Sequence, residues 1–96
     1  MTLEQQLHRG SRAKEVLENE IYIEAFETIE KALIDQWKNS PARDQAGRES
    51  IYLMQTMLQK VQMCLRTTME TGMLAQQELR HKQTLRDQAA AWIGRA

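Results

Sequence analysis

The chain has 96 residues, 42 % of them hydrophobic and 27 % charged, and its 13 basic and 13 acidic side chains give a formal net charge of zero. This length suits one small domain, and the balanced charge argues against a general binder of nucleic acids or other polyanions. A chain this short buries only about 60–65 % of its unfolded surface, so we expect it to gain stability from partner chains.

The composition predicts an all-α fold. Glu, Gln, Arg, Ala, Leu and Met dominate the sequence, and all of them are favourable in helices. No β-rich run and no Asn-Gly or Asp-Gly hairpin signal is present. We expect one helical domain over residues 1–96, an antiparallel helical hairpin with an N-terminal helical arm and an extending C-terminal helix.

The N-terminal arm is predicted over residues 1–10. Thr2-Leu3-Glu4-Gln5 has the pattern of a capping box, in which the first and last of four residues cap each other's backbone amides. Gly10 can end this short helix, with Ser11 capping the next one. The alternative is one continuous helix with a weak point at Gly10.

The next helix is predicted over residues 11–38. Its apolar stripe follows steps of 4, 3, 4 and 4 through Tyr22, Phe26, Ile29, Leu33 and Trp37, which is helical spacing. The opposite face is acidic, because residues 15–35 contain seven acids and one base. This face is a candidate contact surface, represented by Glu20, Glu24 and Glu27.

The stretch SPARD, residues 40–44, predicts a tight corner between two helices. Ser40 suits the N-cap position and Pro41 the first helical position. Asp44 would then lie in the first turn, where negative charge is favourable. Such a short connection favours antiparallel neighbours.

A central helix is predicted over residues 41–71. Its coiled-coil-like seam runs in steps of 3, 4, 3 and 4 through Ile51, Met54, Leu58, Val61 and Leu65. Further apolar residues, such as Met57, widen this seam, so the helix is expected to pack against more than one neighbour. Cys64 is expected to be a buried, small hydrophobic residue. Gly72 either ends the helix or is a weak point within one long helix.

The C-terminal helix is predicted over residues 73–93, with a polar middle and an apolar tip. We expect it to cross to a neighbouring chain with Trp92 as an anchor. The predicted protein interface comprises Met54, Met57, Val61, Met69, Leu85, Trp92 and Ile93. A basic patch of Arg80, Lys82 and Arg86 could contact phosphate, but no aromatic residues interleave with it, so nucleic acid is not the expected partner.

The sequence carries no motif for catalysis, cofactor binding or metal binding. His8 and His81 are far apart, and neither an H-x-x-x-H nor a C-x-x-C pattern occurs. Nothing matches a phosphate loop, a nucleophile elbow or a catalytic triad. Cys64 is the only cysteine, and no apolar run of about 18 residues is present. We therefore expect no enzyme, no cofactor and no membrane partner, and a soluble protein of a reducing cytoplasm.

A pattern over about residues 19–79 resembles a group of small helical proteins encoded in bacteriophages and prophages. The matching features are Glu24-Ala25-Phe26, Trp37, Ser40-Pro41 with Asp44, Arg48-Glu49, and Glu70 with Gly72. The group has no established activity, so no residue roles carry over. The resemblance implies a phage setting near the virion structural genes, and thus the cytoplasm of a host cell or association with the virion.

These observations favour a non-enzymatic, phage-type interaction or assembly protein. It would act as a homo-oligomer or bound to a larger phage or host protein. One alternative is a small regulator or inhibitor of a host protein that uses the acidic face. A second alternative is a weakly nucleic-acid-binding packaging or regulatory subunit.

Overall fold

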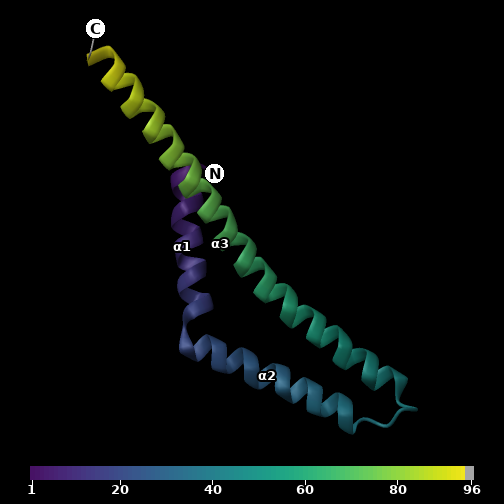
Figure 1. Cartoon of the computed structure of the whole chain (residues 1–96). Coiled ribbons are helices and arrows are strands. Elements are labelled where there is room, and N and C mark those ends of the chain that lie inside the picture. The colour runs from purple at the N-terminus through teal and green to yellow at the C-terminus, as the bar shows by residue number, and fades with distance from the viewer. Residues whose placement is uncertain (95–96) are drawn as a thin grey trace.

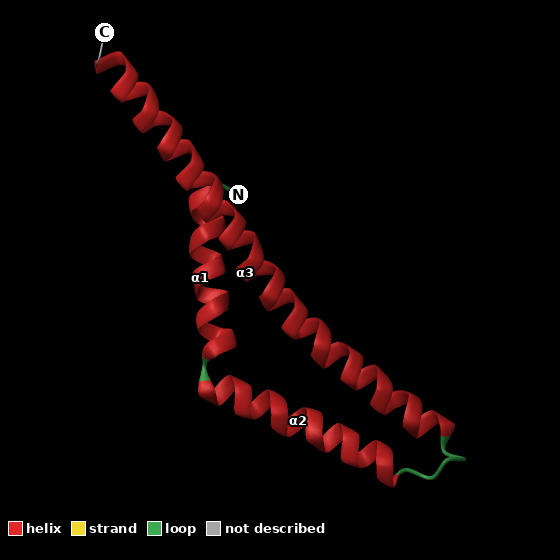
Figure 2. Ribbon diagram, viewed as in Figure 1, coloured by secondary structure: helices red, strands yellow, loops and turns green. Residues whose placement is uncertain are grey.

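The structure, a computed structural model, describes residues 1–94 and places them in three helices, with no strand in that range (Figures 1 and 2). The helices are α1 (Leu3–Glu18), α2 (Glu20–Asn39) and α3 (Gln45–Gly94). In Figure 1, α2 and α3 form an antiparallel hairpin, α1 folds back against α3, and the end of α3 extends beyond α1. The predicted all-α hairpin with an extended C-terminal helix is confirmed.

Helix α1 begins at the predicted capping box. The Thr2 hydroxyl accepts a hydrogen bond from the Gln5 amide at 3.1 Å, and the Gln5 side chain accepts one from the Thr2 amide at 2.9 Å. The helix then continues through Gly10 and Ser11 to Glu18. The predicted boundary at residue 10 is therefore wrong, and the alternative of one continuous helix is correct.

The chain breaks instead at Asn19, inside the segment predicted as one helix over residues 11–38. Asn19 has an extended backbone, with φ −70° and ψ 124°, and its side-chain oxygen accepts a hydrogen bond from the Tyr22 amide at 3.0 Å. Asparagine is among the best N-cap residues, and Asn19 is both the C-cap of α1 and the N-cap of α2. The result is an elbow between the two helices (Figure 2).

The corner between α2 and α3 lies where the sequence predicts it, but its caps differ. Ser40 is the C-cap of α2, and its hydroxyl donates to the Trp37 carbonyl oxygen at 2.6 Å. Asp44, one residue before α3, accepts from the Gly47 amide at 3.1 Å, as an N-cap does. The predicted N-cap at Ser40 and helix start at Pro41 are therefore wrong. Pro41 lies in a turn before α3, in which the Asp44 amide donates a hydrogen bond to the Pro41 carbonyl oxygen at 3.0 Å.

The corner is closed by Arg48, in the first turns of α3. Its guanidinium carbon lies 4.4 Å from the ring centroid of Trp37, a cation–π arrangement. One guanidinium nitrogen also donates to the backbone oxygen and the hydroxyl of Ser40, at 3.3 and 3.2 Å. These contacts tie the end of α2 to the beginning of α3.

Helix α3 is continuous over 50 residues, so the predicted helices 41–71 and 73–93 are one element. At its middle, Gly72 meets Gly10 of α1. A Cβ atom on Gly10 would lie only 2.6 Å from the Gly72 Cα atom. The two glycines therefore permit a close approach of helix backbones, and the buried residues Ala13 and Ala75 extend this contact. A glycine that the sequence suggests as a helix end is here the crossing point of two helices.

The molecule is elongated. Its radius of gyration is 22.0 Å and its extents are 80 × 25 × 18 Å, whereas a compact domain of this length has a radius of gyration of about 12.5 Å. One long helix partly covered by two shorter ones explains this shape (Figure 1). Much of the surface of α3 is therefore left without a neighbour in the same chain.

Candidate protein-interaction surface

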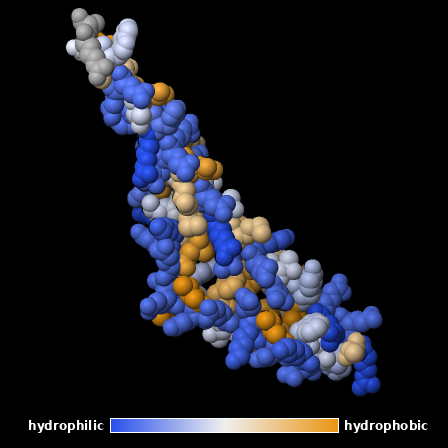
Figure 3. Space-filling view, in the orientation of Figure 1, coloured by the Kyte–Doolittle hydropathy of each residue, from blue (hydrophilic) through white to orange (hydrophobic). Residues whose placement is uncertain are grey.

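Large apolar side chains lie mostly on the surface. Within residues 1–94 the buried hydrophobic residues are only Ala13, Leu33, Ile51 and Ala75. The exposed surface is 8005 Å², against about 5,700 Å² for a compact monomer of 11.2 kDa. Figure 3 shows apolar residues distributed among polar ones along the molecule, up to the end of α3. The chain thus exposes roughly 2,300 Å² more than a compact protein of its mass.

The residues that face α2 from α3 differ in part from the predicted seam. Ile51 is buried, and Leu58 and Leu65 are half-buried as predicted, but Met54 and Val61 are exposed. The positions between the buried ones are occupied by the half-buried Gln55 and Gln62. Glutamine is polar, so a search for apolar residues at helical spacing selects Met54 and Val61 instead. Each of these is the residue just before one of the two glutamines that face α2.

The exposed residues of α3 form a row of their own. Met54, Met57, Val61 and Cys64 follow steps of 3, 4 and 3, so they share one side of the helix. All four are exposed, which corrects the expectation that Cys64 is buried. The same row continues through Thr68, Gly72, Ala75 and Leu79, which are buried or half-buried where α1 packs.

Helix α2 carries a matching row, made of Ile29 from the predicted apolar stripe and three residues that flank that stripe in the sequence. Ile21, Ala25, Ile29 and Ala32 are exposed, and their spacing of 4, 4 and 3 places them on one side of the helix. That spacing was the available signal, but the stronger stripe from Tyr22 to Trp37 obscured it.

The two rows lie on the same side of the hairpin. In an α-helix each residue is rotated by about 100° from the previous one. Viewed from the N-terminus of its own helix, each row lies about a quarter-turn counter-clockwise from the residues that face the other helix. Because α2 and α3 are antiparallel, equal rotations of this kind point to the same side. We call the resulting surface the flank face: Ile21, Ala25, Ile29 and Ala32 of α2 with Met54, Met57, Val61 and Cys64 of α3.

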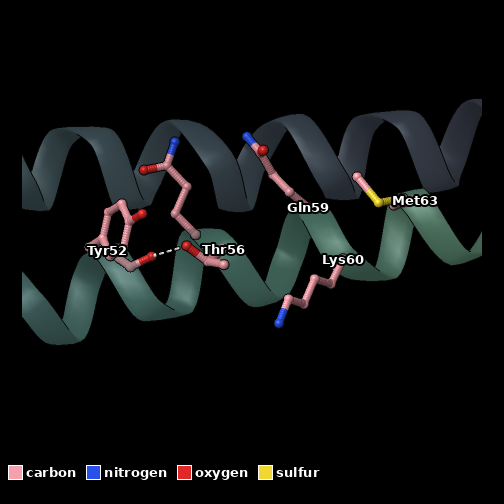
Figure 4. Close-up of a pocket in the computed structure, with 6 residues that line it drawn as sticks. Tyr52, Thr56, Gln59, Lys60 and Met63 are labelled. Carbon is pink, nitrogen blue, oxygen red and sulfur yellow. Dashed lines mark hydrogen bonds between the residues drawn. The ribbon is translucent and has the colours of Figure 1, made fainter.

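The opposite side of α3 carries a more polar groove (Figure 4). It is lined by Tyr52, Gln55, Thr56, Gln59, Lys60 and Met63. The Thr56 hydroxyl donates to the Tyr52 carbonyl oxygen at 2.9 Å, while Lys60 points away from the neighbouring helix in Figure 4. With amides and a lysine among its lining residues, this groove is less apolar than the flank face.

The remaining predicted contact residues lie in several places. Leu85, Trp92 and Ile93 are exposed on the part of α3 that extends beyond α1. Met69 is half-buried and lines a groove between α1 and α3 with Leu7 and Gly10. The structure therefore gathers Met54, Met57 and Val61 on one surface and separates the other predicted interface residues from it.

The predicted charged surfaces differ in coherence. Glu20, Glu24 and Glu27 are exposed and share the outer side of α2. Arg80, Lys82 and Arg86 are also exposed, but Arg80 lies about 120–160° around the helix from the other two. Lys82 is 4.0 Å from Glu78 in an exposed ion pair. The three bases therefore do not form a single patch, which corrects the prediction.

Two further findings concern the described part of the chain. Among residues 1–94, no helix is both long and apolar enough to cross a membrane. In the same range no three His, Cys, Asp or Glu side chains come together in a way that could hold a metal ion.

Comparisons with protein-family models, with curated proteins and with solved structures gave no match for this chain.

Proposed function

We propose that this chain is a non-enzymatic protein-interaction subunit of the phage-assembly type, acting as a homo-oligomer or bound to a larger protein. The observation that carries the proposal is the flank face, which is apolar, spans two helices and contains no Asp, Glu, Lys, Arg or His side chain. Burial of one large apolar side chain is worth roughly 1.5–3 kcal/mol. Several such residues on one surface give a strong drive to associate, and the cores of protein interfaces are likewise depleted of charge.

The phage setting is supported by the resemblance to small helical proteins of bacteriophages and prophages. Three of the residues that carry it, Trp37, Ser40 and Arg48, contact one another at the corner of the hairpin. These residues thus stabilise the corner between α2 and α3. The features shared with the phage proteins therefore include the residues that close this hairpin. In that setting, a subunit with a large uncovered surface fits an assembly role.

A second candidate is a regulator or inhibitor of a host protein. The exposed Glu20, Glu24 and Glu27 on the outer side of α2 favour it, because a coherent acidic surface would accelerate encounter with a basic partner. A nucleic-acid-binding subunit has less support, since the three bases of α3 do not lie on one side.

Sedimentation velocity at low micromolar concentration tests the proposal. A homo-oligomer will sediment with a mass that is a multiple of the 11.2 kDa chain. If the chain is a monomer, titration calorimetry with the products of neighbouring genes tests the form that is bound to a larger protein. A stable monomer that binds none of them would contradict the proposed function.

A further inference from the structure

We propose that a second copy of this chain covers the flank face, with α2 of each copy lying along the Met54–Cys64 row of the other copy's α3. The two copies would be related by a two-fold axis parallel to the helices. This inference rests on the proposed function and specifies its partner and its surface.

The first argument is continuity with a contact that the chain already makes. The row on α3 from Met54 to Leu79 lies on one side of the helix. Helix α1 covers its C-terminal half and runs antiparallel to α3, but the elbow at Asn19 leads the chain to a neighbouring side of α3. The N-terminal half of the row therefore offers a place for one more antiparallel helix, in line with α1.

Helix α2 of a second copy has the required length and direction. Its exposed row from Ile21 to Ala32 spans about 16 Å, and the row from Met54 to Cys64 spans about 15 Å, at 1.5 Å per residue. A two-fold axis parallel to the helices makes each α2 antiparallel to the other copy's α3. Each α1 and the other copy's α2 would then lie end to end along one α3, which gives a bundle of four helices over the part of α3 that α1 and α2 cover.

The side chains are complementary in size at the register that the corner sets. The side chains of Trp37 and Arg48 are in contact. Counting one residue back along α2 for each residue forward along α3 from this pair places Ile21 level with residue 64 and Ala25 with residue 60. An axis parallel to the helices keeps these levels between copies. Ala25 of one copy then faces the space between Met57 and Val61 of the other, with a small residue between two large ones, as in well-packed interfaces.

Charge and area favour an identical copy as the occupant. None of the eight residues of the flank face carries a formal charge, so apposing two such faces brings no like charges together. Over the whole molecule each chain exposes roughly 2,300 Å² more than a compact protein of its mass, and an obligate homodimer buries about 2,000–5,000 Å² in total over both chains.

A pair of charge variants tests the surface. Met57→Glu places a carboxylate in the centre of the flank face, whereas Met63→Glu places one on the opposite side of α3, at a methionine of similar exposure (59 % against 65 %). We expect Met57→Glu to raise the dimer dissociation constant at least about 100-fold, because it buries an unpaired charge, and Met63→Glu to leave it unchanged. Sedimentation equilibrium measures both.

Complementation tests the register and does not depend on how well either variant folds alone. Ala25→Lys and Met57→Glu should each prevent self-association. When the two are mixed, one contact pairs the new lysine with the new glutamate and the reciprocal contact stays native, so the dimer should return. In a mixture of Ala25→Lys with Met63→Glu, the matched control, the Met63→Glu chains should dimerise with one another while the Ala25→Lys chains stay monomeric.

The outcomes separate this inference from the proposed function. A monomeric wild-type chain would overturn the dimer and leave the form bound to a larger protein. An oligomer that persists in Met57→Glu would overturn the flank face as its interface and leave the homo-oligomer. A mixture of Ala25→Lys and Met57→Glu that stays monomeric or unfolded would overturn the register.

Discussion

At the scale of single residues, Asp44 determines where α3 begins. Its carboxylate accepts the Gly47 amide at 3.1 Å, and a Cβ atom on Gly47 would collide with that carboxylate. Ser40 has the same capping chemistry and precedes a proline, so the sequence analysis placed the N-cap at Ser40, four residues before the position that the structure shows. In the structure Ser40 is the C-cap of α2, where Ser40 and Trp37 both contact Arg48.

The first prediction concerns this cap. Asp44→Ala should lower the free energy of unfolding by about 0.5–2 kcal/mol, because it leaves an amide of the first turn unpaired. Asp44→Asn is the control and should lower the free energy of unfolding by at most a few tenths of a kcal/mol, since asparagine caps as well as aspartate. Urea unfolding followed by circular dichroism measures both. Equal losses in the two variants would show that the charge of Asp44, and not its cap, stabilises the helix.

The second prediction concerns the crossing of α1 and α3. Gly72→Ala should lower the free energy of unfolding by about 1–3 kcal/mol, because the added methyl group would overlap the backbone of Gly10. This loss would occur although alanine is intrinsically better in a helix by about 1 kcal/mol. Gly94→Ala is the control, since nothing lies within 4 Å of its Cβ position, and it should be neutral or stabilising. A stabilised Gly72→Ala protein would mean that α1 does not cross α3 at this residue.

At the scale of elements, the sequence predicts the helices and the hairpin well and their boundaries less well. Helix-favouring composition and the stripe from Tyr22 to Trp37 are local properties, and the fold is helical throughout the stripe. Tyr22, Phe26 and Leu33 are half-buried or buried, whereas Ile29 is exposed on the flank face. The roles of Gly10 and Gly72 depend on a contact between helices 62 residues apart, which no local pattern contains. The break at Asn19 did have a local signal, because asparagine before glutamate is a good helix start.

The candidate surface follows the same division. Met54, Met57 and Val61 are predicted from the sequence as interface residues, because too many apolar residues surround α3 for one neighbour, and the structure shows that they are exposed. Which of them face α2 depends on Gln55 and Gln62, whose half-burial is a property of the packed hairpin. The row on α2 becomes visible only once the hairpin defines an inner and an outer side.

The third prediction tests the packing of the hairpin. Leu33→Ala should lower the free energy of unfolding by about 2–5 kcal/mol, because Leu33 is 7 % exposed between α2 and α3. Leu74→Ala, at a leucine that is 65 % exposed, should cost less than about 0.5 kcal/mol. Chemical unfolding at one fixed protein concentration compares the two. A similar loss at both sites would show that the exposed leucine is also covered, by a neighbouring chain.

At the scale of the whole molecule, the stability of the fold and the proposed association are linked, because one chain buries few apolar side chains by itself. Two of the four buried hydrophobic residues in the described range are alanines, so a single chain has little large apolar surface inside. In the proposed dimer the flank faces become the core of a four-helix layer, and the two C-terminal ends, with Leu85, Trp92 and Ile93, extend from the same end. Those three residues would then remain available for a further partner.

The most direct test of this account is the dependence of thermal unfolding on protein concentration. If association supplies the missing core, the unfolding midpoint of the wild-type chain should rise by roughly 5–10 °C over a 100-fold increase in concentration, by mass action. Met57→Glu should abolish this dependence, and Met63→Glu should retain it. A wild-type midpoint that is high and independent of concentration would contradict the account, because it would show that one chain is stable without covering its apolar surface.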